Sequence, residues 1–185
     1  MSFIKKIYKK LRSEFIWFAK GGVVYAKSLG VKVGNDCRIY TKRFGTEPFL
    51  IEIGNRVTIT ADVLLLTHDG STWLIKDEKG RRYTYNRIKI GNNVFIGARS
   101  IIMPGVIIED NVIIGSGSIV TKSVPEGNIV AGNPAKIIGK YDTYKEQVLN
   151  QNMTDQDFIK SNNRMNIIMS FASKAKFKAF MKEAI

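Results

Sequence analysis

The chain contains one histidine, His68, in the segment LLTHDG, and no other side chain in it is as well suited to proton transfer near neutral pH. Imidazole can take a proton from an attacking hydroxyl group, so His68 is a candidate general base. The structural alternative is a histidine whose hydrogen bonds are satisfied at the root of a loop.

The same residue counts argue against a catalytic metal. A zinc site with nitrogen ligands usually needs three histidines, and this chain has one histidine and one cysteine. Cys37 has no partner for an internal disulfide or a shared metal, and we interpret it as a small buried hydrophobic residue. We therefore expect no metal.

A six-residue repeat positions the candidate residues. From Ile90 the sequence reads IGNNVF, IGARSI, IMPGVI, IEDNVI, IGSGSI and VTKSVP. Every unit begins with an aliphatic residue, and its fifth residue is valine or serine. Related units occur upstream, out of frame, at 33–38 and 53–70.

A period of six fits neither an α-helix nor a simple strand, so each unit is predicted to be a short strand followed by a turn. Three units close a triangular coil whose aliphatic residues point inward, while glycines and asparagines supply the turns. The frame breaks at two insertions, 43–50 and 71–88. Loops that leave a rigid scaffold are common places for functional sites.

The stretch from Ile53 to Lys140 resembles the hexapeptide-repeat acetyltransferases, especially galactoside and maltose O-acetyltransferases and the sugar-modifying enzymes of polysaccharide gene clusters. LLTHDG, the long excursion and the run from IGNNVF to GNPAKIIGK carry this resemblance. It implies an all-β core that is a left-handed parallel β-helix, a handedness that periodicity alone does not give. It also implies a homotrimer with sites between subunits, acetyl-CoA as co-substrate, and His68 in the position of the catalytic histidine.

The resemblance further implies a donor site along the outside of the prism. Phe95 falls where the galactoside enzymes place an aromatic residue beside pantetheine, and Ala98 and Ser116 match positions that give backbone contacts. The alternative for Phe95 is an ordinary exposed aromatic residue.

Basic residues near the end of the repeat match the nucleotide part of that donor site. Thr121 and Lys122 match a pair near the nucleotide, and Lys136 matches a phosphate contact. Gly139 stands where the galactoside enzymes carry a second arginine, so the neighbouring Lys140 is a candidate for the same contact. The alternative for these lysines is a solvated face.

Acceptor recognition is assigned to the two insertions. In related polysaccharide-modifying enzymes the bulge FGTEPFL, which holds Glu47, faces the acceptor cleft, and a carboxylate there could hydrogen-bond sugar hydroxyls or orient the histidine. The alternative for Glu47 is a solvated turn residue. Asp69 and Trp73 flank His68 on the excursion, where an aromatic ring can pack on a sugar, or where both could instead anchor the loop. Three arginines could bind an acidic or phosphate-linked acceptor, or keep the loop soluble: Arg81, Arg82 and Arg87.

The two ends read as helices. In the N-terminal segment, 1–30, residues 3–20 are predicted to form an amphipathic helix, with apolar residues three and four apart. Residues 1–20 contain six Lys/Arg and one acid. This helix could cap the open end of the β-helix or contact an acidic membrane surface. The β-helix is expected over 31–140 and a helical tail over 141–185, for which packing and membrane contact are both open.

Composition limits the partners and the location. The net charge of +13 favours anionic partners, but no nucleic-acid-binding signature is present, so we expect no nucleic acid. No apolar run is long enough to span a membrane, and the N-terminus lacks a secretory pattern. We expect a cytoplasmic protein with possible peripheral contact at the inner face of the membrane.

These observations predict an acetyl-CoA-dependent O-acetyltransferase that modifies a saccharide hydroxyl in surface polysaccharide biosynthesis, with His68 as the general base. One alternative is N-acetylation of an amino sugar or another small acceptor. An alternative of another class is a β-helix without enzymatic activity that trimerises or binds membrane.

Overall fold

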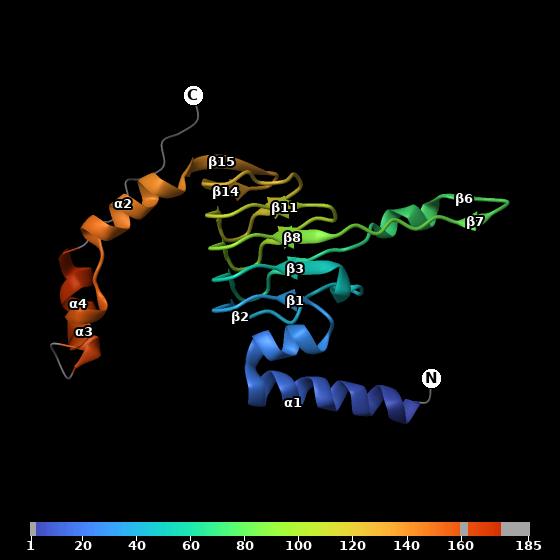
Figure 1. The fold of residues 1–185 in the computed structure, drawn as a ribbon, viewed down its shortest axis with the longest axis horizontal. Coiled ribbons are helices and arrows are strands. Elements are labelled where there is room, and N and C mark those ends of the chain that lie inside the picture. The colour runs from blue at the N-terminus through green and yellow to red at the C-terminus, as the bar shows by residue number, and fades with distance from the viewer. Residues whose placement is uncertain (1–2, 160–162, 175–185) are drawn as a thin grey trace. The chain divides into compact units, whose positions relative to one another are not determined.

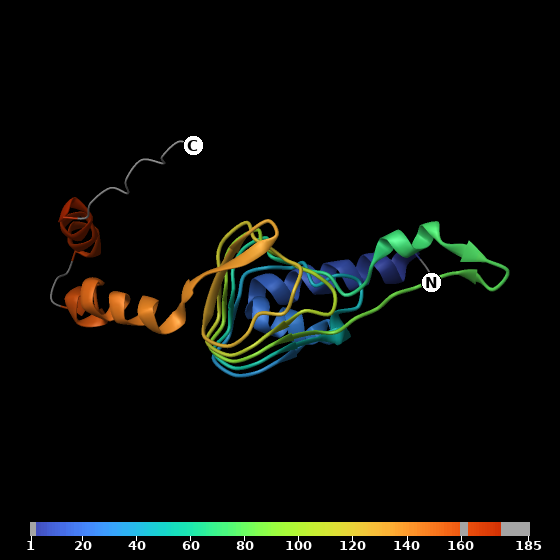
Figure 2. The same ribbon diagram turned by 90° about the horizontal axis from the view of Figure 1, so that it is seen from above.

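The computed structural model describes residues 3–159 and 163–174; the side chains of 3–6, 9 and 174 are not described. Residues 160–162 and 175–185 of the predicted tail therefore lie outside the described residues. The central part is a stack of coils made of short parallel strands (Figure 1). Viewed from above, the coils superimpose around a common outline (Figure 2). The predicted β-helix with helices at both ends is confirmed.

Three parallel sheets form the faces of the prism. Face A contains β1 (Lys32–Val33), β3 (Ile51–Ile53), β8 (Ile88–Ile90) and β11 (Ile107–Ile108). Face B contains β2 (Arg38–Ile39), β4 (Thr58–Ile59), β9 (Phe95–Ile96), β12 (Ile113–Ile114), β14 (Asn128–Gly132) and β15 (Ala135–Lys140). Face C contains β5 (Leu64–Leu65), β10 (Ile101–Ile102) and β13 (Ile119–Val120). The final pair, β14 with β15, is antiparallel.

The six-residue repeat sets the register between coils. Ile90 pairs with Ile108, 18 residues later, and Ile96 pairs with Ile114 at the same spacing. The first residue of each hexad is buried, with between 0 and 2% of its surface exposed: Ile90, Ile96, Ile102, Ile108, Ile114 and Val120. Burial of one such side chain stabilises the fold by roughly 1.5–3 kcal/mol, so the ladder is the core of the protein.

The corners of the coils are held by asparagine side chains. Asn93 adopts a left-handed backbone conformation (φ 57°), which asparagine tolerates better than most residues. Its side chain donates to Asn111 Oδ1 in the next coil at 2.6 Å. Hydrogen bonds between successive turns thus satisfy polar groups that a tight corner leaves exposed.

Helix α1 (Phe3–Ser28) breaks at Gly21, which has φ 79° and ψ 172°. We call residues 3–20 the outer segment and residues 22–28 the inner segment. The inner segment closes the open end of the coil, where Tyr25 and Ala26 are buried. A Cβ on Gly22 would lie 1.9 Å from the Ile39 carbonyl oxygen, so only glycine permits this close approach.

Both insertions contain short ordered elements. The first includes the 3-10 helix η1 (Pro48–Leu50), and the second contains η2 (Gly70–Leu74) and the antiparallel strands β6 (Lys76–Asp77) and β7 (Gly80–Arg81). Figure 1 shows the second insertion projecting far from the coil. It is the most extended feature of the β-helical part.

The chain divides into two compact units, residues 1–144 and 145–185. The tail contains three described helices: α2 (Tyr141–Gln151), α3 (Asp155–Ile159) and α4 (Arg164–Lys174). Large apolar side chains on these helices are exposed, among them Leu149 and Phe171. The candidate site residues all lie in the first unit.

Adjacent residues of β11 test the ladder directly. Ile108 is fully buried and Ile107 is 45% exposed. We expect Ile108→Ala to lower the free energy of unfolding by about 2–5 kcal/mol, because it leaves a cavity. Ile107→Ala should cost less than about 1 kcal/mol. Urea unfolding of both variants checks this, and equal losses would contradict the inward ladder.

Candidate active site

His68 lies at the root of the long excursion, three residues after β5 ends. Two chain segments pair there as a short antiparallel ribbon, in which His68 bridges Tyr85 and the Asn86 amide donates to the Thr67 carbonyl at 2.8 Å. The ring of Tyr85 lies 6.2 Å from the imidazole, between centroids. The coil below and this ribbon together fix the backbone that carries the histidine.

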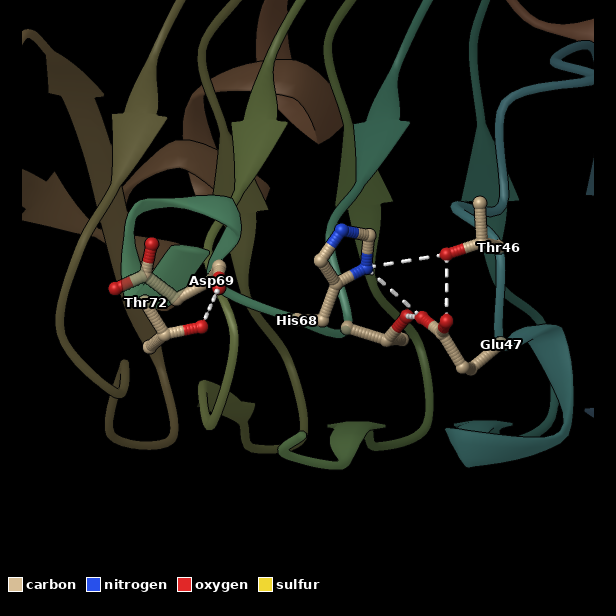
Figure 3. Close-up of polar contacts among 6 residues, drawn as sticks. Thr46, Glu47, His68, Asp69 and Thr72 are labelled. Carbon is tan, nitrogen blue, oxygen red and sulfur yellow. Dashed lines mark hydrogen bonds and ion pairs between the residues drawn. The ribbon is translucent and has the colours of Figure 1, made fainter. Parts of the chain in front are cut away.

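One ring nitrogen of His68 contacts two side chains from the first insertion. Nδ1 lies 3.0 Å from Glu47 Oε2 and 3.1 Å from Thr46 Oγ1. Figure 3 shows both contacts on one side of the ring, with the second nitrogen, Nε2, pointing away from them. The His68 side chain is 36% exposed, so a substrate can reach it.

The Glu47 carboxylate is held by three donors. Thr46 Oγ1 donates to its Oε1 at 2.6 Å, Thr67 Oγ1 donates to its Oε2 at 2.8 Å, and His68 completes the set. Desolvation by burial acts to raise the pKa of Glu47, but the hydrogen bonds from Thr46, Thr67 and His68 outweigh it and the pKa is lowered. The site therefore holds a carboxylate that stays ionised.

This arrangement selects the tautomer of His68. An ionised carboxylate only accepts hydrogen bonds, and Thr46 gives its single hydroxyl proton to Glu47. Both neighbours of Nδ1 can therefore only accept from it, which places the ring proton on Nδ1. Nε2 then carries the free lone pair, and the pair Glu47–His68 can act as an oriented base.

The coil geometry explains why Glu47 meets a residue 21 positions away. Arg43 bridges Leu64 of β5 in the next coil, so both insertions leave neighbouring coils at the same corner. Phe44 is buried, and Gly45 (φ 66°) turns the chain so closely that a Cβ would lie 2.9 Å from the Leu65 carbonyl oxygen. The bulge thus starts with a buried aromatic anchor, which the sequence pattern alone did not indicate.

Asp69 and Trp73 lie on the excursion but not against the imidazole. Asp69 caps η2, accepting from the Ser71 amide at 2.9 Å, and hydrogen bonds from Ser71 lower its pKa. Its backbone carbonyl accepts from Thr72, as Figure 3 shows. Trp73 is 65% exposed, and its ring lies under the Arg81 guanidinium, 4.8 Å from the centroid.

An aromatic row runs along the excursion from the site. Tyr85, next to His68, stacks on Tyr83 with centroids 6.3 Å apart and planes 6° apart. Arg81 lies over Tyr83 at 4.5 Å and over Trp73, so these groups form a chain of contacts from the imidazole outward. Of the other two predicted arginines, Arg82 pairs with Asp77 and Arg87 is exposed near the base of the loop.

The predicted donor residues lie on the outer surface of the prism. Phe95 is 40% exposed on face B. Ala98 and Ser116 occupy equivalent corners of successive coils, where the Ala98 carbonyl accepts from the Gly117 amide at 2.8 Å. Phe95, Ala98 and Ser116 thus lie on neighbouring turns of the coil, and each is at least partly exposed to solvent.

The remaining donor candidates lie at two places. Thr121 and Lys122 directly follow β13. On face C, Leu65 pairs with Ile102 and Ile102 pairs with Val120. Thr121 and Lys122 therefore lie at the same edge of the prism as His68, two coils further along the stack. Lys136 is exposed on β15. Lys140 donates to Asn128 Oδ1 at 2.9 Å, so it helps to close the end of the coil.

Three residues at the site were not predicted from the sequence. Thr46 and Thr67 hold the Glu47 carboxylate, and Tyr85 flanks the imidazole. A possible signal for Thr67 is its place next to the only histidine. In residues 3–159 and 163–174, no group of three or more His, Cys, Asp or Glu side chains could hold a metal ion.

The profile described as "Bacterial transferase hexapeptide (six repeats)" matches residues 87–122. Protein CapG of Staphylococcus aureus is 44% identical over 149 residues, which cover 79% of this chain and 84% of that protein. Galactoside O-acetyltransferase of Escherichia coli strain K12 is 39% identical over 92 residues, or 50% of this chain and 45% of the enzyme. The chain thus spans most of the first relative and about half of the second.

A solved structure agrees with the sequence comparison. Galactoside acetyltransferase in complex with coenzyme A superimposes with a TM-score of 0.50 at 25% identity, covering 75% of this chain and 84% of that one. The structural similarity extends beyond residues 87–122, which the family profile matches. The similar protein was solved in complex with coenzyme A.

Thr67→Val tests the carboxylate network. Loss of the hydroxyl donor should raise the pKa of Glu47 toward its ordinary value of 4.5. Carbon-13 NMR titration of glutamate side-chain carboxyls checks this, with Thr60→Val as the control because that hydroxyl bonds the Ile96 carbonyl instead. An unchanged Glu47 titration in Thr67→Val would contradict the network.

The same network gives a pH dependence of stability. Because the pKa of Glu47 is lower in the folded chain than its ordinary value of 4.5, folding favours the ionised form. The stabilisation is present above about that value and is lost as the pH falls through the folded pKa.

Proposed function

Because the chain belongs to the hexapeptide-repeat acetyltransferases, we propose that it transfers an acetyl group from acetyl-CoA to a hydroxyl of a saccharide acceptor. The chain is an enzyme of that family, and its coil is left-handed, as the resemblance predicted. The observation that carries the proposal is the Glu47–His68 pair, which leaves Nε2 free on an exposed side chain. The saccharide is inferred from the galactoside acetyltransferases to which the chain is similar.

In the proposed reaction Nε2 of His68 takes the proton of the acceptor hydroxyl as its oxygen attacks the thioester carbonyl. A carbon–oxygen bond forms, and the carbon–sulfur bond of the tetrahedral intermediate then breaks. The protonated imidazole returns its proton to the departing coenzyme A thiolate. The products are the acetyl ester and free coenzyme A, and His68 ends in its starting state.

Glu47 acts as a positioning residue in this scheme. It holds the Nδ1 proton and stabilises the imidazolium that forms during proton transfer, since the two atoms lie 3.0 Å apart. Thr46 and Thr67 orient the carboxylate in turn. Of the two roles that the sequence suggested for Glu47, we therefore propose that it orients the histidine and does not bind the sugar directly.

The donor is proposed to bind along the outer surface of the coil. Phe95 would flank the pantetheine arm, with backbone contacts from Ala98 and Ser116. Cationic side chains would meet the phosphates, as charge-assisted hydrogen bonds do elsewhere: Lys122 and Lys136, with Thr121 beside them. Lys140 is a weaker candidate because its ammonium already bonds Asn128. We propose that neighbouring subunits of a homotrimer complete this site.

The acceptor is proposed to lie along the aromatic row of the excursion. The rings of Tyr85, Tyr83 and Trp73 are each more than half exposed and lead away from His68. Such a row offers successive apolar faces on which sugar rings can pack, and Arg81 adds a cation. This favours an extended saccharide over a single sugar, consistent with a role in surface polysaccharide biosynthesis. Asp69 shapes the loop through its cap.

Activity of two variants tests the chemistry. We expect His68→Ala to lower transfer from acetyl-CoA to a saccharide panel by at least about 10²–10⁴-fold, because no other base replaces Nε2. Glu47→Gln should lower kcat by about 10²-fold or more while KM for acetyl-CoA is unchanged. Asp69→Asn is the matched control and should stay active. A His68→Ala enzyme with normal turnover would sink the mechanism.

Binding of acetyl-CoA tests the donor site. We expect Lys122→Glu/Lys136→Glu to raise the Kd for acetyl-CoA by on the order of tenfold to hundredfold, because two phosphate contacts are reversed in charge. Lys20→Glu/Lys27→Glu changes the net charge equally on α1 and should leave the Kd unchanged. Isothermal titration calorimetry measures both, and an unchanged Kd in the first variant would remove these lysines from the site.

A further inference from the structure

The outer segment of α1 carries an apolar stripe that the coil does not cover. Its members lie three and four residues apart and have 44% or more of their surface exposed, reaching 80% for Phe18: Ile7, Tyr8, Leu11, Phe15 and Phe18. This spacing puts them on one face of the helix. A row of five large apolar side chains on a surface marks a binding face rather than scattered exposure.

The opposite face of the same segment is already used. Ile16 and Trp17 pack against the core, and the Trp17 ring meets Tyr25 of the inner segment edge-on at 5.3 Å between centroids. The break at Gly21 separates the outer segment from the inner one, which closes the coil. The inner segment therefore caps the coil without the stripe. Capping and membrane contact, the two roles that the sequence left open, can be carried out by different faces and segments of α1.

Positive charge accompanies the stripe. Residues 1–20 contain six Lys/Arg, and their one acid, Glu14, is paired with Lys42 at 2.5 Å. Lys10 and Arg12 are exposed beside the stripe, each three residues from one of its members along the helix. The outer segment thus presents apolar side chains flanked by cations.

We propose that the outer segment binds the surface of an anionic lipid bilayer, with the stripe among the acyl chains and the cations at the headgroups. Anionic headgroups complement the charge, whereas the same segment of a second copy would bring like charges together. The contact is with the surface: in the part of the chain that the structure describes, no helix is long and apolar enough to cross a bilayer.

This placement also brings the candidate active site to the membrane. The outer segment and the excursion extend from the coil in the same direction in both views (Figures 1 and 2). His68 lies at the root of that excursion. An acceptor carried by a lipid would meet the site there. This consequence rests on the proposed function, but the lipid binding does not.

Vesicle sedimentation of the full chain tests the proposal. We expect the wild type to pellet with phosphatidylcholine vesicles that contain phosphatidylglycerol and to stay in solution with phosphatidylcholine alone, with binding weakened by added salt. Leu11→Ser/Phe15→Ser should weaken binding by roughly tenfold to hundredfold. The matched control, Leu149→Ser/Phe171→Ser, alters an exposed leucine and phenylalanine of the tail and should bind like the wild type.

Three results would overturn the proposed membrane contact. The first is a wild type that does not pellet with anionic vesicles, and the second is a Leu11→Ser/Phe15→Ser variant that pellets as well as the wild type. The third is loss of binding in the tail variant alone, which would assign the contact to the C-terminal helices. Sedimentation velocity of the same variants tests whether the stripe instead joins two copies of the chain. If Leu11→Ser/Phe15→Ser forms a smaller oligomer than the wild type and its vesicle binding is unchanged, the stripe is a protein interface. Normal acetyl transfer in solution by a variant that does not bind vesicles would leave the proposed function standing.

Discussion

The whole structure depends on one steric constraint, which is that every coil must place an aliphatic side chain under the one before it. Ile90 lies over Ile108 and Ile96 over Ile114, each 18 residues apart. An insertion can enter only if the chain leaves the prism and returns in register. Ile53 pairs with Ile90, 37 residues on, and Val33 pairs with Ile53, 20 residues on, yet the inward ladder is unbroken at both places.

The candidate site is a consequence of that constraint. Because both insertions leave adjacent coils at the same corner, a carboxylate from one and the histidine from the other meet without any direct link in sequence. The buried Thr67 then contributes a hydroxyl from inside the coil. The rigid part of the molecule thus sets the tautomer of the imidazole, while the exposed excursion is free to meet an acceptor. The coil therefore orients the catalytic candidate, and the excursion provides the surface that an acceptor can reach.

Much of this could be predicted from the sequence, because the repeat is local and strict. The period gives the inward residues, the frame breaks give the insertions, and one histidine leaves a single candidate base. The contact of Glu47 with His68 could be raised only as an alternative, since it depends on how a bulge of eight residues folds. Phe44 anchors that bulge in the core, and nothing in the hexad pattern indicates it. The apolar spacing predicts a helix over 3–20 and so stops before the break at Gly21, but it gives no indication of the inner segment that follows.

The central claim is that Glu47 holds the proton of His68 on Nδ1 and so leaves Nε2 as the base. Nitrogen-15 NMR of histidine-labelled protein tests this most directly, because the chain has one histidine and gives one imidazole spectrum. At a pH where the ring is neutral, the account predicts a protonated Nδ1 and an unprotonated Nε2. A neutral ring that carries its proton on Nε2 would contradict it.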